Sequence, residues 1–110
     1  MYRRGDVLYA SLEGIGSEQK GIMPVVIIQN DAGNDKSNTI IVAPVGKRKK
    51  PPCCMHFIFY EKEGGIRKDS VLMCEQIKVI DKSRVLSKIG YLSQDTMLKI
   101  NKKIKRQLGL

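Results

Sequence analysis

One continuous run of branched apolar residues limits what this chain can fold into. Pro24 is followed by four β-branched residues, Val25 to Ile28, and polar segments flank the run on both sides. Such side chains favour extended backbone, and a run without polar alternation is typical of a strand that is buried on both faces or central in a sheet. Pro24 can begin this strand because it needs no ladder partner there. The sequence therefore predicts a buried strand over residues 24–29.

Other short apolar segments predict that the rest of the chain is mainly β. The further strands that we expect are residues 6–10, 39–45 and 56–60, with one or two more between 70 and 80 around Glu75. Turn residues separate them at 30–35 and at Gly64-Gly65. Pro44 indicates an edge or a bulge near the end of the strand over residues 39–45, because proline cannot donate a ladder hydrogen bond.

Helix signals come late in the chain. Asp81 is expected to cap a short turn that Gly90 ends, and Ser93 to cap a longer C-terminal helix. Leu92 and Met97 are placed to form a hydrophobic staple at its start. An apolar stripe at helical spacing lies opposite a lysine-rich face; it consists of Met97, Ile100, Ile104 and Leu108. Short strands followed by one helix predict a single domain over residues 1–110, a small curved sheet or barrel closed by the helix.

The net charge of +9 and the pI near 9.6 make a polyanion the expected partner, with mere solubility as the alternative. Two basic clusters are evident: Lys47-Arg48-Lys49-Lys50, and Lys99, Lys102, Lys103, Lys105 and Arg106. The second cluster forms the polar face of the expected helix, and such a face is more often a solvated surface than a binding site. Nucleic acid is the partner class that this charge favours.

The cysteines favour a reducing compartment and argue against metal binding. Cys53 and Cys54 are adjacent, and a disulfide between neighbours is strained. One histidine and no C-x-x-C pair argue against a zinc site. Catalysis by Cys53 or Cys54 with His56 is conceivable, but two small residues entering a strand is the better interpretation. With no signal peptide and no apolar run of about 20 residues, we expect a cytosolic protein without a bound metal.

Several motifs, in order and spacing, resemble the MazF/PemK family of toxins from type II toxin–antitoxin systems. They are RGDV (4–7), GSEQ-x-G (16–21), PVVIIQND (24–31), IVAPV (41–45) and the D-S-V…EQI…ID segment (69–81). The resemblance covers nearly the whole chain. It implies a small SH3-like barrel of the PemK/MazF/CcdB type with a C-terminal helix, usually a homodimer. It also implies an mRNA interferase: a metal-independent endoribonuclease that cleaves single-stranded RNA, needs no cofactor and is neutralised by a cognate antitoxin.

The resemblance also identifies two positions at which this chain departs from the family. The family's catalytic arginine directly precedes the proline that opens the second strand, and its catalytic threonine follows the residues that match Ala43-Pro44-Val45. Met23 and Gly46 occupy these positions. A thioether offers no charge or exchangeable proton, and glycine offers only its backbone. Candidate substitute cations are Lys20 in the preceding loop and Lys47 or Arg48 after Gly46, although a lysine with an unperturbed pKa is a poor base at neutral pH.

The residues that we expect to contact RNA combine cations with amides and one carboxylate. They are Arg4, Lys20, Gln29, Asn30, Lys47, Arg48, Lys49, Lys50, Glu75 and Gln76. For Gln29 and Asn30, bracing of loops is an equally good interpretation. Two functions remain open: an endoribonuclease with an altered or weak site, and a catalytically silent member that binds RNA or an antitoxin without cleaving. A gyrase-poisoning relative of the same fold is less favoured, because the EQI and GSEQ motifs point to the RNA-cleaving branch.

Overall fold

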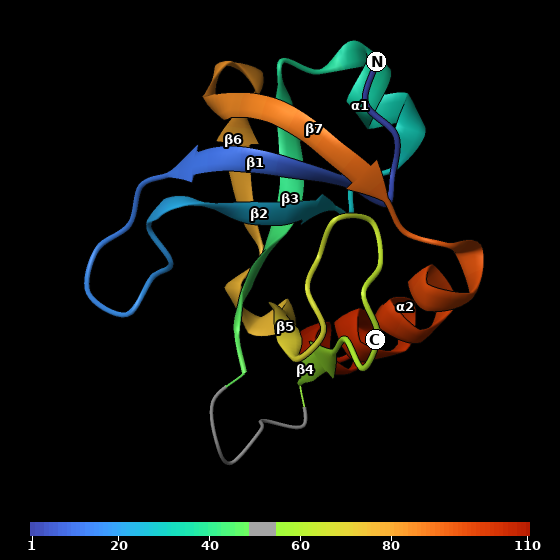
Figure 1. Cartoon of the computed structure of the whole chain (residues 1–110). Helices are drawn as coiled ribbons and strands as arrows, with labels where there is room; N and C mark the ends of the chain where they lie inside the picture. Colours follow the sequence, from blue (N-terminus) through green and yellow to red (C-terminus); the bar gives the residue numbers. More distant parts are fainter. Residues whose placement is uncertain (49–54) are drawn as a thin grey trace.

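The computed structural model describes residues 1–48 and 55–110, and it consists of strands followed by a C-terminal helix (Figure 1). The elements in chain order are β1 (Asp6–Leu12), β2 (Gly21–Ile27), α1 (Asp31–Lys36), β3 (Thr39–Lys47), β4 (His56–Ile58), β5 (Ser70–Met73), β6 (Lys78–Asp81), β7 (Val85–Tyr91) and α2 (Gln94–Leu108). Short 3-10 turns, η1 (Cys74–Gln76) and η2 (Lys82–Arg84), precede β6 and β7. The prediction of a mainly β chain with a C-terminal helix is confirmed. Within the described part of the chain, neither helix is both long and apolar enough to cross a membrane.

The apolar run of the sequence forms the centre of the fold. Strand β2 lies between β1 and β3, and Val25, Val26 and Ile27 have no exposed surface. Because successive side chains of a strand point to opposite faces, Val26 packs into one apolar cluster while Val25 and Ile27 pack into another. The prediction of a buried strand is confirmed for Val25 to Ile27, and burial on both faces explains why the run lacks polar alternation. Its predicted bounds were wrong, because the strand begins at Gly21, with Pro24 inside it, and ends at Ile27.

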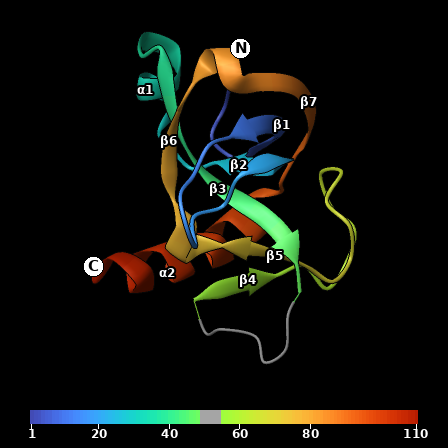
Figure 2. The ribbon, with the colours of Figure 1, turned by 90° about the vertical axis from the view of Figure 1, so that its left-hand side faces the viewer.

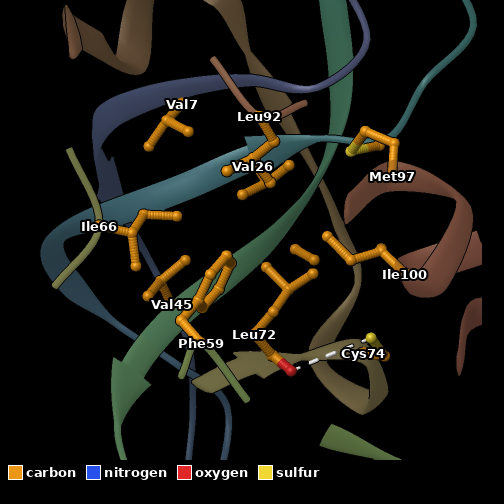
Figure 3. Close-up of a cluster of buried hydrophobic side chains, with 11 residues drawn as sticks. Val7, Val26, Val45, Phe59, Ile66, Leu72, Cys74, Leu92, Met97 and Ile100 are labelled. Atoms are coloured by element: carbon orange, nitrogen blue, oxygen red, sulfur yellow. Dashed lines mark hydrogen bonds between the residues drawn. The ribbon is translucent and has the colours of Figure 1, made fainter. Parts of the chain in front are cut away.

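The two clusters divide the core. The first lies between the sheet and α2, and it includes Val26 and Leu72 of the sheet together with Leu92, Met97 and Ile100 (Figure 3). The second occupies the other face of the central strands; it comprises Leu8, Ala10, Leu12, Val25, Ile27, Ile40, Val42 and Ile80. Ser93 caps α2 by accepting a hydrogen bond from the Thr96 N–H, and Leu92 and Met97 share the first cluster, as the predicted staple requires.

Strand β3 changes partners along its length. On one side it pairs with β2 from Val42 to Pro44, where Val25 is opposite Pro44. On its other side, β6 pairs with the N-terminal half of β3 and β5 pairs with Val45 to Lys47. Proline has no N–H for a ladder hydrogen bond, and a proline lies on each strand here, Pro24 and Pro44. The irregularity predicted at Pro44 is thus the place where β3 leaves β2 (Figure 2).

The sheet is open, which corrects the expectation of a closed barrel. Its strand order is β4-β5-β3-β2-β1-β7, with β6 paired to β3, and among the described residues β4 and β7 do not pair with each other. The divergence of β3 carries β5 and the three-residue strand β4 away from β1 and β7 (Figure 1). The divergence therefore prevents closure of the sheet.

Two local predictions were wrong. Residues 31–36 form the short helix α1 in place of a turn, because Asn30 caps it by accepting from the Gly33 N–H. Asp81 does cap a short turn, but that turn ends at Val85 and not at Gly90. Gly90 lies inside β7, a strand that the sequence did not predict.

Gly90 is needed because a loop packs directly against it. The loop between β4 and β5 turns at Gly64, and a Cβ on Gly90 would lie 2.8 Å from the Gly64 carbonyl oxygen. Glu63 fixes the same loop to the start of α2, where its carboxylate accepts from the Ser93 N–H at 3.0 Å and from the Thr96 hydroxyl at 2.8 Å. Buried Ile66 anchors its other side in the first cluster. The loop is therefore held in a defined position over the sheet.

We expect Gly90→Ala to lower the free energy of unfolding by about 1–3 kcal/mol, because the added methyl group meets backbone atoms that cannot move independently. Ser87→Ala, at an exposed position of the same strand, should change it by less than about 0.5 kcal/mol. Urea titration measures both values. Equal stability of the two variants would contradict the close packing of this loop on β7.

Candidate active site

A cleft opens at the point where β3 leaves β2. Its volume is about 260 Å³, and three residues of the loop before β5 line it. This loop lies in front of the sheet in the view of Figure 1. Its lining residues come from three neighbouring strands, the loop and β5; they are Tyr9, Pro24, Val45, Gly46, Lys47, Gly65, Ile66, Arg67 and Ser70. The cleft is therefore built by the fixed loop on one side and by the diverging strands on the other.

The two positions that the sequence singled out flank this divergence. The β2–β3 ladder ends with Val25 opposite Pro44. Continuing the same register by two residues would place Met23 opposite Gly46, but by then Gly46 pairs with Val71 of β5. The antiparallel register thus brings these two positions close together in space, and of the two only Gly46 is among the residues that line the cleft.

Neither position supplies a side chain for proton transfer or charge stabilisation. The half-buried Met23 side chain packs against the second apolar cluster. At Gly46, a Cβ would lie 3.0 Å from the terminal methyl of Met73, so that methionine occupies the space next to the glycine. Met23 and Gly46 therefore both lie among apolar groups, which suit a thioether and a glycine.

Other polar groups do enter the cleft. Lys47 and Arg67 supply cations, and no ion pair among residues 1–48 and 55–110 involves either one. Tyr9 and Ser70 supply hydroxyl groups from β1 and β5. Sequence reasoning identified Lys47 but missed Tyr9, Arg67 and Ser70. The available signal was the D-S-V motif, which contains Ser70 and begins two residues after Arg67.

Arg48 directly follows Lys47 at the end of β3, and it already makes contacts with Asp69. Its backbone N–H donates to the Asp69 carbonyl at 3.2 Å, and its guanidinium lies 3.8 Å from the Asp69 carboxylate. Asp69 has a φ of 65°, a left-handed conformation that is uncommon outside glycine. The described contacts thus give Arg48 a structural task at the start of β5.

Lys20 lies in a different hollow. The loop between β1 and β2 forms it, with Glu13, Ile15 and Glu18 of the loop and Leu12 at the end of β1 among its lining residues. Two residues near η1 hold this loop: the Gln76 amide donates to the Ser17 carbonyl at 3.5 Å, and the Lys78 ammonium donates to the Glu13 carbonyl. Glu75 points elsewhere, with its carboxylate 2.5 Å from His56 Nε2. The structure therefore does not bring Lys20 or Glu75 into the cleft.

Three further predicted site residues brace the fold near α1, at the opposite end of β3 from Gly46 (Figure 1). Arg4 donates to the Ile28 carbonyl at 2.8 Å and to the Asn101 amide oxygen at 2.7 Å. Gln29 donates to the Thr39 carbonyl at 3.1 Å, and Asn30 is the cap of α1. The loop-bracing interpretation thus accounts for the polar contacts of Gln29 and Asn30. The guanidinium of Arg4 is likewise hydrogen-bonded to other residues of the protein.

The backbone N–H of Arg4 makes a further hydrogen bond to α1. It donates to the Asp31 carboxylate at 2.7 Å, and this hydrogen bond, with help from Asn34 and Arg3, lowers the pKa of Asp31. The N-terminal segment is therefore fixed to α1 by a carboxylate that stays ionised at neutral pH.

Of the three cysteines, only Cys74 lies among the described residues. Cys53 and Cys54, like Lys49 and Lys50, lie outside the described residues. Cys74 is buried in the first cluster, and burial raises the pKa of its thiol to about 11, so that the thiol is protonated and unreactive at neutral pH. In residues 1–48 and 55–110, no three His, Cys, Asp or Glu side chains are grouped as ligands for a metal ion.

Comparison with known proteins agrees with the resemblance in the sequence. A family model described as "PemK-like, MazF-like toxin of type II toxin-antitoxin system" matches residues 3–108. The endoribonuclease MazF of Staphylococcus saprophyticus is 46% identical over all of this chain and 93% of its own length. The MazF crystal structure from Deinococcus radiodurans superposes with a TM-score of 0.85 at 19% identity, covering 99% of this chain and 97% of that one.

A mycobacterial endoribonuclease solved in complex with its cognate antitoxin has a TM-score of 0.81 at 19% identity, covering 100% of this chain and 97% of that chain. At such identities the solved structures establish a shared fold. The family match and the S. saprophyticus relative establish more, because each spans nearly the whole chain. The chain belongs to the PemK/MazF family of type II toxin–antitoxin toxins, and it is a MazF-like toxin homologous to an endoribonuclease.

Proposed function

We propose that this toxin acts on single-stranded RNA in the cleft between β2 and β3, and that it cleaves RNA slowly without a metal ion. The observation that carries this proposal is the cleft at the end of the β2–β3 ladder, which is lined by Gly46, one of the two family positions, and by the cations of Lys47 and Arg67. The 46% identical relative, which is an endoribonuclease, supports RNA as the substrate class.

The reaction requires few groups. The ribose 2′-oxygen attacks the adjacent phosphorus and loses its proton, while the bond to the 5′-oxygen breaks and that oxygen gains a proton. A cyclic phosphate and a free 5′-hydroxyl are the products. Cations are needed where negative charge develops on the phosphoryl oxygens, and hydroxyl groups can carry protons. Lys47 and Arg67 fill the first role in the proposal, and Tyr9 and Ser70 the second.

The expected rate is low because the family's arginine and threonine are absent. Loss of one well-placed donor typically costs about 10²–10³ in rate. The cations in the cleft favour slow cleavage over a catalytically silent protein, because they bring positive charge to the place where a phosphate would lie.

The wider setting follows from the family. We propose a cognate antitoxin as the partner, since a mycobacterial endoribonuclease of the same fold was solved in complex with its cognate antitoxin. We also propose that the toxin is a homodimer and works in the cytoplasm, where its RNA substrate and a reducing environment for its thiols are both present.

Restoring the two family side chains should raise activity. We expect Met23→Arg with Gly46→Thr to increase cleavage of a long single-stranded RNA by about 10²-fold or more, and each change alone to do less, because charge stabilisation and proton transfer act together. The cleavage must persist in a chelator and leave a cyclic phosphate. The Gly46→Thr change requires the flexible end of Met73 to move, so circular dichroism must show native folding.

The matched control is Met23→Gln with Gly46→Ala, which adds side-chain atoms at both positions without the charge or the hydroxyl. It should leave cleavage at the level of the unmodified protein. An equal gain in the control and in the restored variant would show that the family positions do not limit the reaction.

The residual activity of the unmodified protein should depend on Arg67. We expect Arg67→Ala to reduce cleavage by about 10²-fold, the typical effect of removing one donor that stabilises developing charge. Lys68→Ala removes a neighbouring exposed cation that does not line the cleft, and it should leave the rate unchanged. Equal rates for the two variants would remove Arg67 from the reaction.

A further inference from the structure

A second groove lies between β4 and the C-terminal half of α2, and none of its lining residues lines the cleft. Its volume is about 430 Å³. It is lined by His56, Phe57, Ile58, Tyr60, Lys99, Lys102, Lys103 and Arg106. No aspartate or glutamate is among these lining residues, so the groove combines apolar walls with positive charge.

The positive charge follows one face of the helix. Lys99, Lys102 and Arg106 are three and four residues apart, so their side chains lie along one side of α2 over an axial distance of about 10 Å. All three are exposed, and the ion pairs of the described residues include none of them. The charge is therefore available to an anionic ligand.

The opposite wall offers aromatic rings. Tyr60 is 67% exposed at the edge of the groove. Phe57 packs edge-on against Phe59, with ring centroids 5.0 Å apart at 83°, which fixes its orientation beside the groove. His56, the other ring, is held by Glu75 at 2.5 Å. The fixed rings of Phe57 and His56 thus form the wall of the groove, and the exposed ring of Tyr60 is free to take up a stacking partner.

We propose that this groove binds single-stranded RNA outside the cleft, with phosphates on the α2 cations and a base stacked on Tyr60. A row of cations facing aromatic rings, one of which (Tyr60) is exposed, is the kind of arrangement by which proteins hold single strands without reading their sequence. An acidic peptide would satisfy the cations, but it would leave the aromatic wall without a planar partner. The groove would hold a strand whose other part lies in the cleft, and in this respect it rests on the proposed function.

The test uses a short fluorescein-labelled oligouridylate with 2′-O-methyl groups, which cannot be cleaved because the attacking hydroxyl is blocked. Anisotropy titrations at several salt concentrations give the Kd and its salt dependence. Lys99→Ala with Arg106→Ala should weaken binding and reduce the magnitude of the slope of log K against log salt by about 1.4, since each phosphate contact on a single strand contributes about 0.7. Lys36→Ala with Lys105→Ala removes two lysines that do not line the groove and should leave the slope unchanged.

Tyr60 gives an independent readout. Tyr60→Ala should raise the Kd by about fivefold or more, the typical effect of removing one stacking ring, whereas Tyr60→Phe keeps the ring and should bind as the unmodified protein does. Ultraviolet crosslinking of the oligonucleotide should map to Tyr60. Because Tyr60 is mostly exposed, neither variant is expected to disturb folding.

Several results would overturn the proposal. Equal losses in the two double variants would indicate diffuse electrostatic attraction. Equal binding of Tyr60→Ala and Tyr60→Phe would exclude stacking. Polyglutamate that competes as well as RNA of the same charge would assign the groove to an acidic peptide, and an altered sedimentation coefficient of the groove variants would assign it to a second copy of the chain.

Failure here is distinguishable from failure of the proposed function. If the groove variants bind normally while Arg67→Ala loses cleavage, the groove is not an RNA site and the cleft remains one. If the protein never cleaves RNA but the groove variants bind more weakly, the groove stands without the cleft.

Discussion

The end of the β2–β3 ladder determines most of what this molecule can do. Pro24 and Pro44 both lie there, and neither has an N–H to extend the pairing. Strand β3 therefore turns away and joins β5, the sheet stays open, and a cleft forms between backbone segments that are otherwise tightly paired. The loop that covers this cleft is fixed separately, by Gly90, Glu63 and Ile66. The shape of the site thus depends on backbone geometry and core packing.

This separation of shape from chemistry means that the fold does not depend on polar side chains at the two positions that the resemblance in the sequence singled out. Met23 lies against an apolar cluster, and Gly46 leaves room for the end of Met73. Both residues thus fit the apolar packing around them. The charge required for phosphate chemistry has other sources in the cleft, Lys47 and Arg67, which reach it from β3 and from the loop.

Local sequence patterns predicted the elements that bury apolar side chains. The run after Pro24, the cap at Ser93 and the stripe that includes Ile100 all appear where expected, because burial and capping act over a few neighbouring residues. Strand β7 was missed because its alternation is weak: its side chains are all partly or fully exposed, and Gly90 resembles a terminator until the loop packed against it is known.

The site was harder to predict, because it depends on contacts between residues that are distant in the sequence. Motif matching located Met23 and Gly46, but Tyr9 and Arg67 come to the cleft only through strand pairing and the folding of a loop. The guanidinium of Arg4 joins the N-terminal segment to α2, a role that its charge did not indicate, and its contact with RNA stays a prediction. Distant contacts of this kind leave no local pattern in the sequence.

A crystal structure of the toxin with a single-stranded RNA that carries a 2′-deoxy sugar at the scissile position tests the central claim most directly. The account predicts a phosphate between Pro24 and Gly46, with the Lys47 ammonium and the Arg67 guanidinium within hydrogen-bonding distance of its oxygens. An RNA backbone that bypasses this cleft, with its scissile phosphate held by residues elsewhere on the protein, would contradict it.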